Sequence, residues 1–598
     1  MGNSVSFPFG ESLDGSSEGR LASTAFLIVV CLLIYKMFIV KLWGCSYANK
    51  AMVARNDGVR MEHFKKAKEL AEQLDQETAK TITGYDLPTL REKLQTGSVS
   101  AEQALLAYWR KALQVHADIN CLIDVVLDAY DEAVKLDRKY KDAKKPPLFG
   151  IPFSVKGNFF MKGFDCTLGL TKFMDQPKNS DCSLVTYLRT QGAVPFVITN
   201  VPQALLSFVC SNAVYGTTGN PHNKARTPGG SSGGEAALVA AGGAPFGIGS
   251  DLAGSLRIPA AMCGIVSIKP TESRLCATNA HGGVPGRGRL GLSYGFFTRC
   301  VEDQVFLLDN ILSSDEYVKL VRKTAPVPFR HLEYNEHKKG KTLKIGYFVN
   351  DGFLKPVPAC ARVVNETVEK LRSAGHELVV FKVPEPMRMA EIFYKNLMPD
   401  GGKYISGLFA HDLVDKYMTR FVTLLNIPAF VRYIASYFAR PFSPQLALLC
   451  KSYVSSLPEL RKNQEFTDDY FEKFSNEWKE AELDALICPA FTVPSVPHEF
   501  PSDLGACAVS TGFWNMLDYS AGVVPTGVVT EEDDSLLASD SFWTVGYNPV
   551  LRKMREAASD SKGMPLSVQI VTPPFCEEAC LSLMKHVEEL WSKPAEQK

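Results

Sequence analysis

Residues 229–271 read GGSSGGEAALVAAGGAPFGIGSDLAGSLRIPAAMCGIVSIKPT, and they combine closely spaced glycines with serines at positions 231, 232 and 255. Glycines at this density let backbone N–H groups converge, as they do in an oxyanion hole or an anion-binding nest. From the residues alone, the stretch could form flexible surface loops, although apolar runs flank it. It could also contain the G-x-S-x-G turn of an α/β-hydrolase, with Ser231 as the nucleophile. That turn needs a preceding strand, whereas residues 220–228 are typical of a turn-rich loop.

Short apolar runs alternate with helical stretches on both sides of this segment. The alternation predicts an α/β fold, a twisted mixed β-sheet covered by helices on both faces. No internal repeat or low-complexity linker divides the region, so we expect one catalytic domain over residues 96–598, preceded by a helical arm at 44–95. The expected strands lie at 151–155, 193–198, 265–268, 343–348 and 378–381, and the expected helices at 52–74, 101–115 (capped by Ser100), 235–241 and 361–371.

Composition excludes several classes of protein. The 598 residues contain 65 Lys and Arg against 65 Asp and Glu, so the net charge is zero and no nucleic-acid partner is expected. The 15 cysteines form no C-x-x-C pair, which favours free thiols in a reducing compartment. There is no H-E-x-x-H and no P-loop, and the G-x-G-x-x-G at 286–291 follows Pro285 rather than an expected strand. We therefore expect neither a metal nor a cofactor.

Residues 21–43 predict a transmembrane anchor behind an N-terminal tail at 1–20. The apolar run LASTAFLIVVCLLIYKMFIV, interrupted only by Lys36, has about the ~20 residues that a membrane-spanning helix needs. Acidic residues precede it, where a cleaved signal peptide would be basic. Basic residues follow it, so the positive-inside rule places the catalytic domain in the cytosol. The alternative is a buried core helix.

The 229–271 stretch resembles the signature of the amidase signature hydrolases. Residues 147–156 (PLFGIPFSVK), 298–303 (TRCVED) and 563–569 (GMPLSVQ) resemble further segments of that family, so the resemblance covers most of the chain after about residue 90. It implies the amidase signature fold and a Lys-Ser-Ser triad that works through an acyl-enzyme. Lys156 is then the general base, Ser231 the relay and Ser255 the nucleophile. A lysine can take a serine proton only when it is neutral, and burial favours its neutral form.

The same resemblance implies further roles around Ser255. The backbone N–H groups of Leu252, Ala253, Gly254 and Ser255 would form the oxyanion hole, where each donor is typically worth about 3–4 kcal/mol. Ala253 stands where the commoner family pattern has glycine. Ser232, Asp251 and Arg257 are expected beside the site in structural roles. We interpret Asp251 and Arg257 as an ion pair that positions the loop, the alternative being two solvated charges.

Residues 421–442 predict an amphipathic helix between Pro428 and Pro441. Aromatic and apolar residues recur on one side and Arg432, Ser436 and Arg440 lie opposite, which is typical of a helix at a membrane interface; an ordinary core helix is the alternative. We expect such membrane-cap helices at about 411–445. The apolar stripe consists of Phe430, Tyr433, Ile434, Tyr437 and Phe438.

Residues 200–203, 515–525 and 530–534 resemble segments of membrane-anchored family members that act on fatty acid amides. This resemblance implies hydrolysis of N-acylethanolamines and primary fatty amides to free fatty acid and amine, by a homodimer on an endomembrane such as the endoplasmic reticulum. It also places Leu205 and Leu206 beside the acyl chain. Hydrolysis of another lipid amide or ester, and a catalytically silent membrane scaffold, remain as alternatives.

Overall fold

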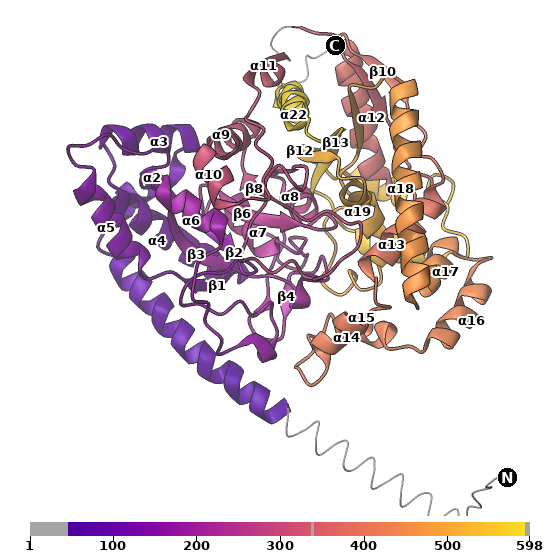
Figure 1. The fold of residues 1–598 in the computed structure, drawn as a ribbon, viewed down its shortest axis with the longest axis horizontal. Helices are drawn as coiled ribbons and strands as arrows, with labels where there is room; N and C mark the ends of the chain where they lie inside the picture. Colours follow the sequence, from indigo (N-terminus) through magenta and orange to yellow (C-terminus); the bar gives the residue numbers. More distant parts are fainter. Residues whose placement is uncertain (1–45, 337–339, 593–598) are drawn as a thin grey trace, which may run out of the picture.

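The computed structural model describes residues 46–336 and 340–592. The tail and the anchor expected at 1–20 and 21–43 lie outside the described residues. The described part of the chain starts with a long helix over 46–71, which we call the arm helix, and this helix runs along one flank of the rest of the structure (Figure 1).

One mixed sheet of eleven strands forms the centre of the described residues, in the order β1-β3-β2-β6-β8-β7-β12-β13-β11-β9-β10. The pairs β2–β3, β2–β6, β9–β10 and β9–β11 are parallel, and the other neighbours are antiparallel. A separate two-stranded hairpin consists of β4 (Ser211–Asn212) and β5 (Gly216–Thr217). The strands of the sheet are β1 Leu122–Val125, β2 Pro152–Lys156, β3 Val194–Thr199, β6 Gly247–Asp251, β7 Val266–Lys269, β8 Ser293–Thr298, β9 Lys344–Tyr347, β10 Glu377–Val380, β11 Ala485–Pro489, β12 Ser520–Val528 and β13 Pro565–Thr572.

Helices pack against the sheet in two groups. Helices α9, α12 and α22 contact strands β7, β8 and β10 to β13. Helices α4 and α7 contact β2 and β3, α7 also contacts β6 and β8, and α8 contacts β7, β12 and β13. The helices are α2 Gln76–Gly84, α3 Leu87–Thr96, α4 Ala101–Ile119, α5 Ala129–Lys139, α6 Ser183–Thr190, α7 Gly233–Ala240, α8 Arg257–Cys263, α9 Val301–Leu312, α10 Asp315–Leu320, α11 His331–Tyr334, α12 Pro358–Ser373, α13 Pro386–Leu397, α14 Lys403–Phe409, α15 Thr419–Leu425, α16 Ala429–Ala439, α17 Pro444–Lys451, α18 Leu457–Glu480, α19 Val509–Met516, α20 Glu531–Ala538, α21 Pro549–Ala558 and α22 Glu577–Ser592.

The predicted elements are confirmed within a few residues. The five expected strands correspond to β2, β3, β7, β9 and β10, and the helices expected at 235–241 and 361–371 correspond to α7 and α12. Ser100 caps α4 through a capping box in which Ser100 and Gln103 each accept the other's backbone N–H. Strand β6 was not predicted, because its sequence GIGSD is typical of a loop. Its glycines are required by packing, since a Cβ on Gly247 would lie 1.8 Å from Glu235 Oε2.

Helix α16 carries its apolar stripe on the outside. Phe430, Tyr433 and Tyr437 are 68%, 73% and 75% exposed, whereas Ser436 on the opposite side is buried and donates to the main-chain oxygen of Ala447. Interpreting this stretch as an ordinary core helix is therefore wrong. Within the described residues no single helix is long and apolar enough to span a membrane; α15 and α16 pass that test only together, and they meet at 102°.

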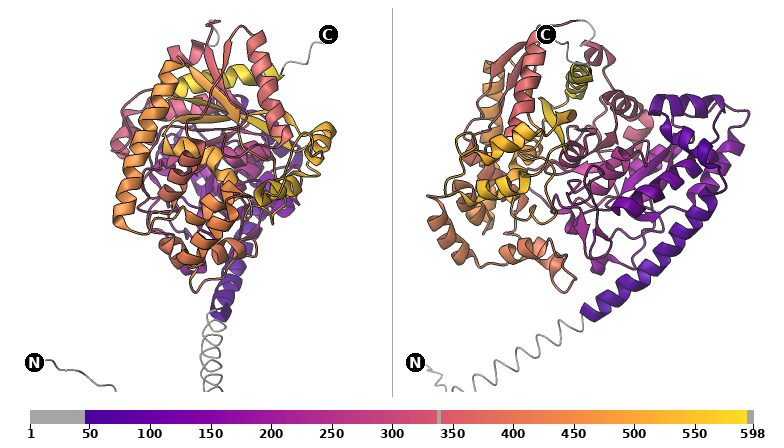
Figure 2. Two further views of the ribbon diagram at one scale, coloured as in Figure 1. Left: turned by 90° about the vertical axis from the view of Figure 1, so that its right-hand side faces the viewer. Right: turned by 180° about the vertical axis from the view of Figure 1, so that it is seen from behind.

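Helices α14 to α17, which we call the cap helices, lie at the same end of the molecule as the start of the arm helix (Figures 1 and 2). A hydrogen bond joins the two parts, because Asn49 Nδ2 on the arm helix donates to the main-chain oxygen of His411 at 3.1 Å. His411 lies in the connection between α14 and α15. The arm helix and the cap helices therefore present one common end of the protein.

Candidate active site

The predicted site residues gather where parallel strands end. Lys156 is the last residue of β2, and Ser250 and Asp251 end the neighbouring parallel strand β6. In α/β proteins the carboxyl ends of parallel strands form the crevice in which ligands bind. The parallel pairing of β2 with β6 thus brings Lys156 to the loop that carries Ser255.

The glycine-rich run at 229–234 is a packed turn rather than a flexible loop. Gly229 has φ +85°, and a Cβ there would lie 2.7 Å from Pro259 Cα; a Cβ on Gly234 would lie 2.5 Å from the Asn200 nitrogen. The peptide bond between Gly230 and Ser231 is cis. No strand immediately precedes Ser231, so interpreting the run as the G-x-S-x-G turn of an α/β-hydrolase is wrong.

Lys156, Ser231 and Ser255 form a continuous hydrogen-bonded chain. Lys156 Nζ donates to Ser231 Oγ at 2.9 Å, and Ser231 Oγ donates to Ser255 Oγ at 3.0 Å. Lys156 and Ser231 are buried, while Ser255 is partly exposed. The arrangement connects a buried amine to a hydroxyl that a substrate can reach.

Burial lowers the pKa of Lys156 to about 7, although the Asp251, Cys210 and Glu235 side chains would raise it through their negative charge. An ammonium loses much of its hydration in this interior, and no carboxylate of residues 46–336 or 340–592 contacts Nζ to compensate. A substantial fraction of Lys156 is therefore neutral near pH 7, and the neutral amine can accept a proton.

Two buried residues complete the surroundings of Lys156. Lys156 Nζ also contacts Ser250, at 3.0 Å from Oγ and 3.4 Å from the main-chain oxygen. Asn158 Nδ2 donates to the same Ser250 Oγ at 3.1 Å. Neither residue was predicted, because the sequence does not show the strand register that places the end of β6 beside Lys156. The only signal in the sequence was their position: Ser250 precedes Asp251, and Asn158 lies two residues after Lys156.

Asp251 and Arg257 form an ion pair in which both side chains are fully buried. The alternative interpretation of Asp251 and Arg257, as two solvated charges, is therefore wrong. Burial alone would raise the pKa of Asp251, but the charge and hydrogen bonds of Arg257 outweigh it and hold that pKa well below its usual range. The carboxylate also accepts the backbone N–H groups of Gly254 and Leu256 at 2.7 and 3.1 Å, so the pair fixes the loop on both sides of Ser255.

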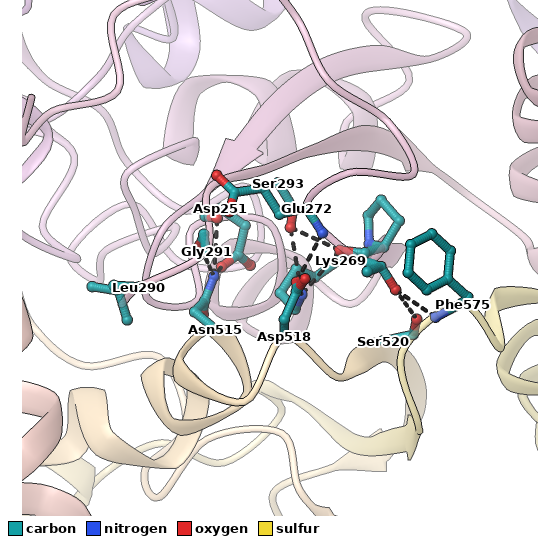
Figure 3. A network of polar contacts seen from close by, with 12 residues as sticks. Asp251, Lys269, Glu272, Leu290, Gly291, Ser293, Asn515, Asp518, Ser520 and Phe575 are labelled. Atoms are coloured by element: carbon teal, nitrogen blue, oxygen red, sulfur yellow. Dashed lines mark hydrogen bonds and ion pairs between the residues drawn. The ribbon is translucent and has the colours of Figure 1, made fainter. Parts of the chain in front are cut away.

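Asn515 and Gln569 extend this network, and neither was singled out from the sequence. Arg257 donates to Gln569 Oε1 at 2.8 Å and to Asn515 Oδ1 at 2.6 Å. Asn515 Nδ2 in turn reaches Asp251 and the main-chain oxygen of Gly291, as Figure 3 shows. Asn515 lies within the 515–525 segment, and the resemblance of that segment to family members was the signal in the sequence that could have pointed to this residue.

The backbone donors expected for the oxyanion hole are not equivalent. The N–H of Gly254 is occupied by Asp251, whereas no acceptor among the described residues is found for the N–H groups of Leu252, Ala253 and Ser255. Gly254 has φ +114°, and a Cβ there would lie 2.3 Å from Thr511 Oγ1. Ala253 is not at positive φ, so its methyl group imposes no backbone strain in this loop. Three of the four predicted donors are thus free.

Leu206 and Leu252 line an apolar cluster on the side of the cap helices. Leu252, in the loop of Ser255, also packs against the main core. Leu205 and Ala204 have φ +63° and +58°, so this turn is conformationally strained. We call this group the cap-side cluster; its buried members are Leu170, Ala204, Val284, Met398, Ile405, Leu408, Phe409, Met418 and Leu425.

Ser232 and Glu235 are fully buried beside the hydrogen-bonded chain of Lys156, Ser231 and Ser255. Ser232 Oγ approaches the main-chain oxygen of Ser250 at 3.5 Å, which links the two loops. Glu235 accepts hydrogen bonds from Ser154 Oγ at 2.5 Å and Thr199 Oγ1 at 2.8 Å. Burial raises the pKa of Glu235 to about 8. Glu235 was not predicted as a site residue, although it lies within the quoted stretch.

Comparison with known proteins places this chain in a family. The family model "Amidase" matches residues 103–581. The chain is 33% identical over 529 residues to Fatty acid amide hydrolase 1 of Caenorhabditis elegans, covering 88% of this chain and 92% of that protein. It is 34% identical over 512 residues to Fatty-acid amide hydrolase 1 of Sus scrofa, covering 85% and 86% respectively.

A solved structure titled "Fatty acid amide hydrolase" superposes with a TM-score of 0.72 and covers 93% of this chain and 95% of that one, at 22% identity. That likeness concerns the fold, and it confirms the amidase signature α/β fold with its large mixed sheet. The family model and the curated relatives extend over most of the chain. The chain therefore belongs to the amidase signature family and is a hydrolase of amide C–N bonds.

Proposed function

We propose that this protein hydrolyses fatty acid amides, including N-acylethanolamines and primary fatty amides, to free fatty acid and amine. In the proposal Ser255 is the nucleophile, Ser231 the relay and Lys156 the general base. The observation that carries it is the hydrogen-bonded chain from Lys156 Nζ through Ser231 Oγ to Ser255 Oγ.

The first half of the reaction acylates Ser255. Ser255 Oγ attacks the amide carbonyl carbon while its proton passes to Ser231 Oγ, and the proton of Ser231 passes to neutral Lys156. The carbonyl oxygen gains negative charge, which the free N–H groups of Leu252, Ala253 and Ser255 would stabilise. As the C–N bond breaks, the leaving nitrogen takes a proton back from Lys156 through Ser231 and departs as an amine.

The second half restores the enzyme. Water attacks the acyl carbon and gives up a proton through the same relay, and the C–O bond to Ser255 breaks. Ser255 regains its proton, and the free fatty acid leaves. Ser231 is suited to this relay because its hydroxyl lies within 3.0 Å of both the amine and the nucleophile.

A lipid substrate is favoured by the surroundings of Ser255. The cap-side cluster begins at Leu252 in the loop of Ser255, includes Leu206 at its edge and continues into α14 and α15. An acyl chain bound along such an apolar surface contributes about 0.8 kcal/mol per buried CH₂ group. Two relatives, each at least 33% identical, are named fatty acid amide hydrolases, which supports the same substrate class.

Attachment to a membrane is part of the proposal. The outward apolar stripe of α16 and the hydrogen bond between Asn49 and His411 support a membrane-facing end formed by the arm and cap helices. In this proposal residues 21–43 are a single-pass anchor, and residues 44–95 and 96–598 are the arm and the catalytic domain in the cytosol. Location on the endoplasmic reticulum and a homodimeric state rest on the family resemblance.

Labelling with a fluorophosphonate tests the proposal, because the reagent reacts only with an activated serine. We expect wild-type protein to be labelled at Ser255 and to release fatty acid from a long-chain N-acylethanolamine, and Ser255→Ala to lose both. The acid limb of kcat/KM should lie near pH 7, where Lys156 loses its proton. Labelling at a different serine, or no release of fatty acid, contradicts the proposal. The alternatives would then be hydrolysis of another lipid amide or ester, or a catalytically silent membrane scaffold.

A further inference from the structure

Asn158 is a fully buried amide whose orientation is fixed. Its Nδ2 donates to Ser250 Oγ at 3.1 Å and to the main-chain oxygen of His281 at 2.8 Å. A main-chain oxygen can only accept, so the contact with His281 requires the nitrogen, not the oxygen, on this side. Asn158 Oδ1 has no partner within the described residues. The amide is thus satisfied at its donor end only, and that end faces Ser250.

Ser250 Oγ is shared between two donors. Lys156 Nζ lies 3.0 Å away on one side and Asn158 Nδ2 lies 3.1 Å away on the other. The charged lysine has three N–H groups, and its three oxygen neighbours are Ser231 Oγ, Ser250 Oγ and the Ser250 main-chain oxygen. The neutral amine has only two N–H groups, so it depends less on Ser250 Oγ. Any weakening of that acceptor therefore disfavours the ammonium more than the amine.

Asn158 weakens this acceptor in two ways. Its N–H group takes up one of the two lone pairs of that oxygen and draws electron density from it, and the positive end of its amide dipole points toward the ammonium across that oxygen. The ionisable groups facing Lys156 are Asp251 on β6, Glu235 on α7 and Cys210 in the loop before β4. All three favour the ammonium when they are negatively charged, so Asn158 acts against them.

We propose that Asn158 is a positioning residue that acts through Ser250: by donating to Ser250 Oγ it weakens that oxygen as a partner for the ammonium and keeps Lys156 available as a neutral base for Ser231. The inference rests on the proposed function, because it requires Lys156 to be the base. It assigns the orphaned amide a role in tuning the base rather than in binding substrate.

The test is the pH dependence of fluorophosphonate labelling at Ser255 and of kcat/KM for a long-chain fatty amide. Asn158→Ala should move the acid limb upward by about 0.5–1 pH unit, which from a limb near pH 7 is about a two- to five-fold loss at pH 7 that is recovered at pH 9. Asn158→Asp, which has nearly the same shape, should move it in the same direction through its negative charge. Ser250→Ala removes the contested acceptor, so it should not move the limb upward, and adding Asn158→Ala to it should produce no further shift.

Asn396→Ala is a matched control, since Asn396 is a fully buried amide that donates to Thr467 on α18, outside the triad. It should leave the acid limb in place even if it lowers stability. If Asn158→Ala and Asn158→Asp lower the rate equally at every pH and the acid limb does not move, the inference is wrong. The proposed function still stands in that case, provided that Ser255 of the wild type is labelled. If wild-type Ser255 is not labelled, the proposed function and the inference fall together.

Discussion

Arg257 and Asp251 form a two-point ion pair without solvent exposure: Nε lies 3.0 Å from Oδ2, and Nη2 lies 2.9 Å from Oδ1. The same carboxylate accepts the N–H groups of Gly254 and Leu256, so the ion pair holds the backbone on both sides of Ser255. Its contribution is to the geometry of the loop, because neither charge contacts the Ser255 hydroxyl.

We expect Arg257→Ala to lower the free energy of unfolding by about 3–5 kcal/mol, because it leaves the Asp251 charge buried without its partner. The loosened loop should also slow labelling of Ser255. Urea unfolding and labelling rates check both effects. Arg257→Lys keeps the positive charge but loses the two-point hydrogen bonding of the guanidinium group. Its free energy of unfolding and its labelling rate should therefore lie between those of the wild type and Arg257→Ala. An unchanged labelling rate in Arg257→Ala would show that the loop holds its shape without the pair.

Lys156→Ala should reduce turnover of a fatty amide more than turnover of the ester with the same acyl chain. An amine leaves only after it receives a proton, which the proposed relay through Ser231 would deliver, whereas an alcohol leaves more readily without that help. The comparison of kcat/KM for the matched amide and ester measures this selectivity. Equal losses on both substrates would contradict a proton relay to the leaving group.

The resemblance named Lys156, Ser231 and Ser255, which the structure joins by hydrogen bonds, and the chemistry of an amine base led to the expectation of a neutral Lys156; their catalytic roles stay predictions. The surroundings of that lysine could not be predicted. Ser250 and Asn158 meet it through the parallel register of β2 with β6, and the glycines of β6 are typical of a loop. The occupation of the Gly254 N–H by Asp251 also depends on a side-chain conformation that the spacing of the two residues does not determine.

Glu235→Gln should change how stability depends on pH. The folded-state pKa of Glu235 is raised to about 8 by burial, above its usual value of 4.5, so the folded protein holds a proton that the unfolded chain releases between these values. The contribution of Glu235 to the free energy of unfolding is therefore fully present below about pH 4.5 and is lost as pH rises through 8. Glu235→Gln should therefore gain stability relative to the wild type as pH rises from 5 to 8, as measured by thermal unfolding of both proteins at both pH values.

Glu578 provides the matched control for this slope. It is equally buried, but Arg274 outweighs the effect of burial and lowers its pKa, so its own contribution changes only below about pH 4.5. Glu578→Gln should destabilise the protein at both pH values without altering the difference between pH 5 and pH 8. If Glu235→Gln shows the wild-type difference, Glu235 is ionised in the folded protein.

The outward stripe of α16 leads to a prediction about how the substrate arrives. Phe430 and Phe438 are 68% and 66% exposed, and each aromatic side chain gains about 1.5–3 kcal/mol when apolar surroundings cover it. We expect the double variant Phe430→Ser and Phe438→Ser to raise KM by at least about ten-fold for a long-chain amide delivered in vesicles. Turnover of a short, water-soluble amide should stay unchanged, because neither residue belongs to the site.

The control for that experiment is Leu332→Ser, since Leu332 is 78% exposed on α11 and has no part in the cap helices. It removes a comparable exposed apolar side chain, so it should leave KM unchanged for both substrates. A loss confined to the vesicle-borne amide in the α16 variant means that the cap helices act at the lipid surface. An equal loss on the soluble amide would instead mean that α16 supports the fold of the site, through the buried contacts of Ser436 and Arg432 on its inner side.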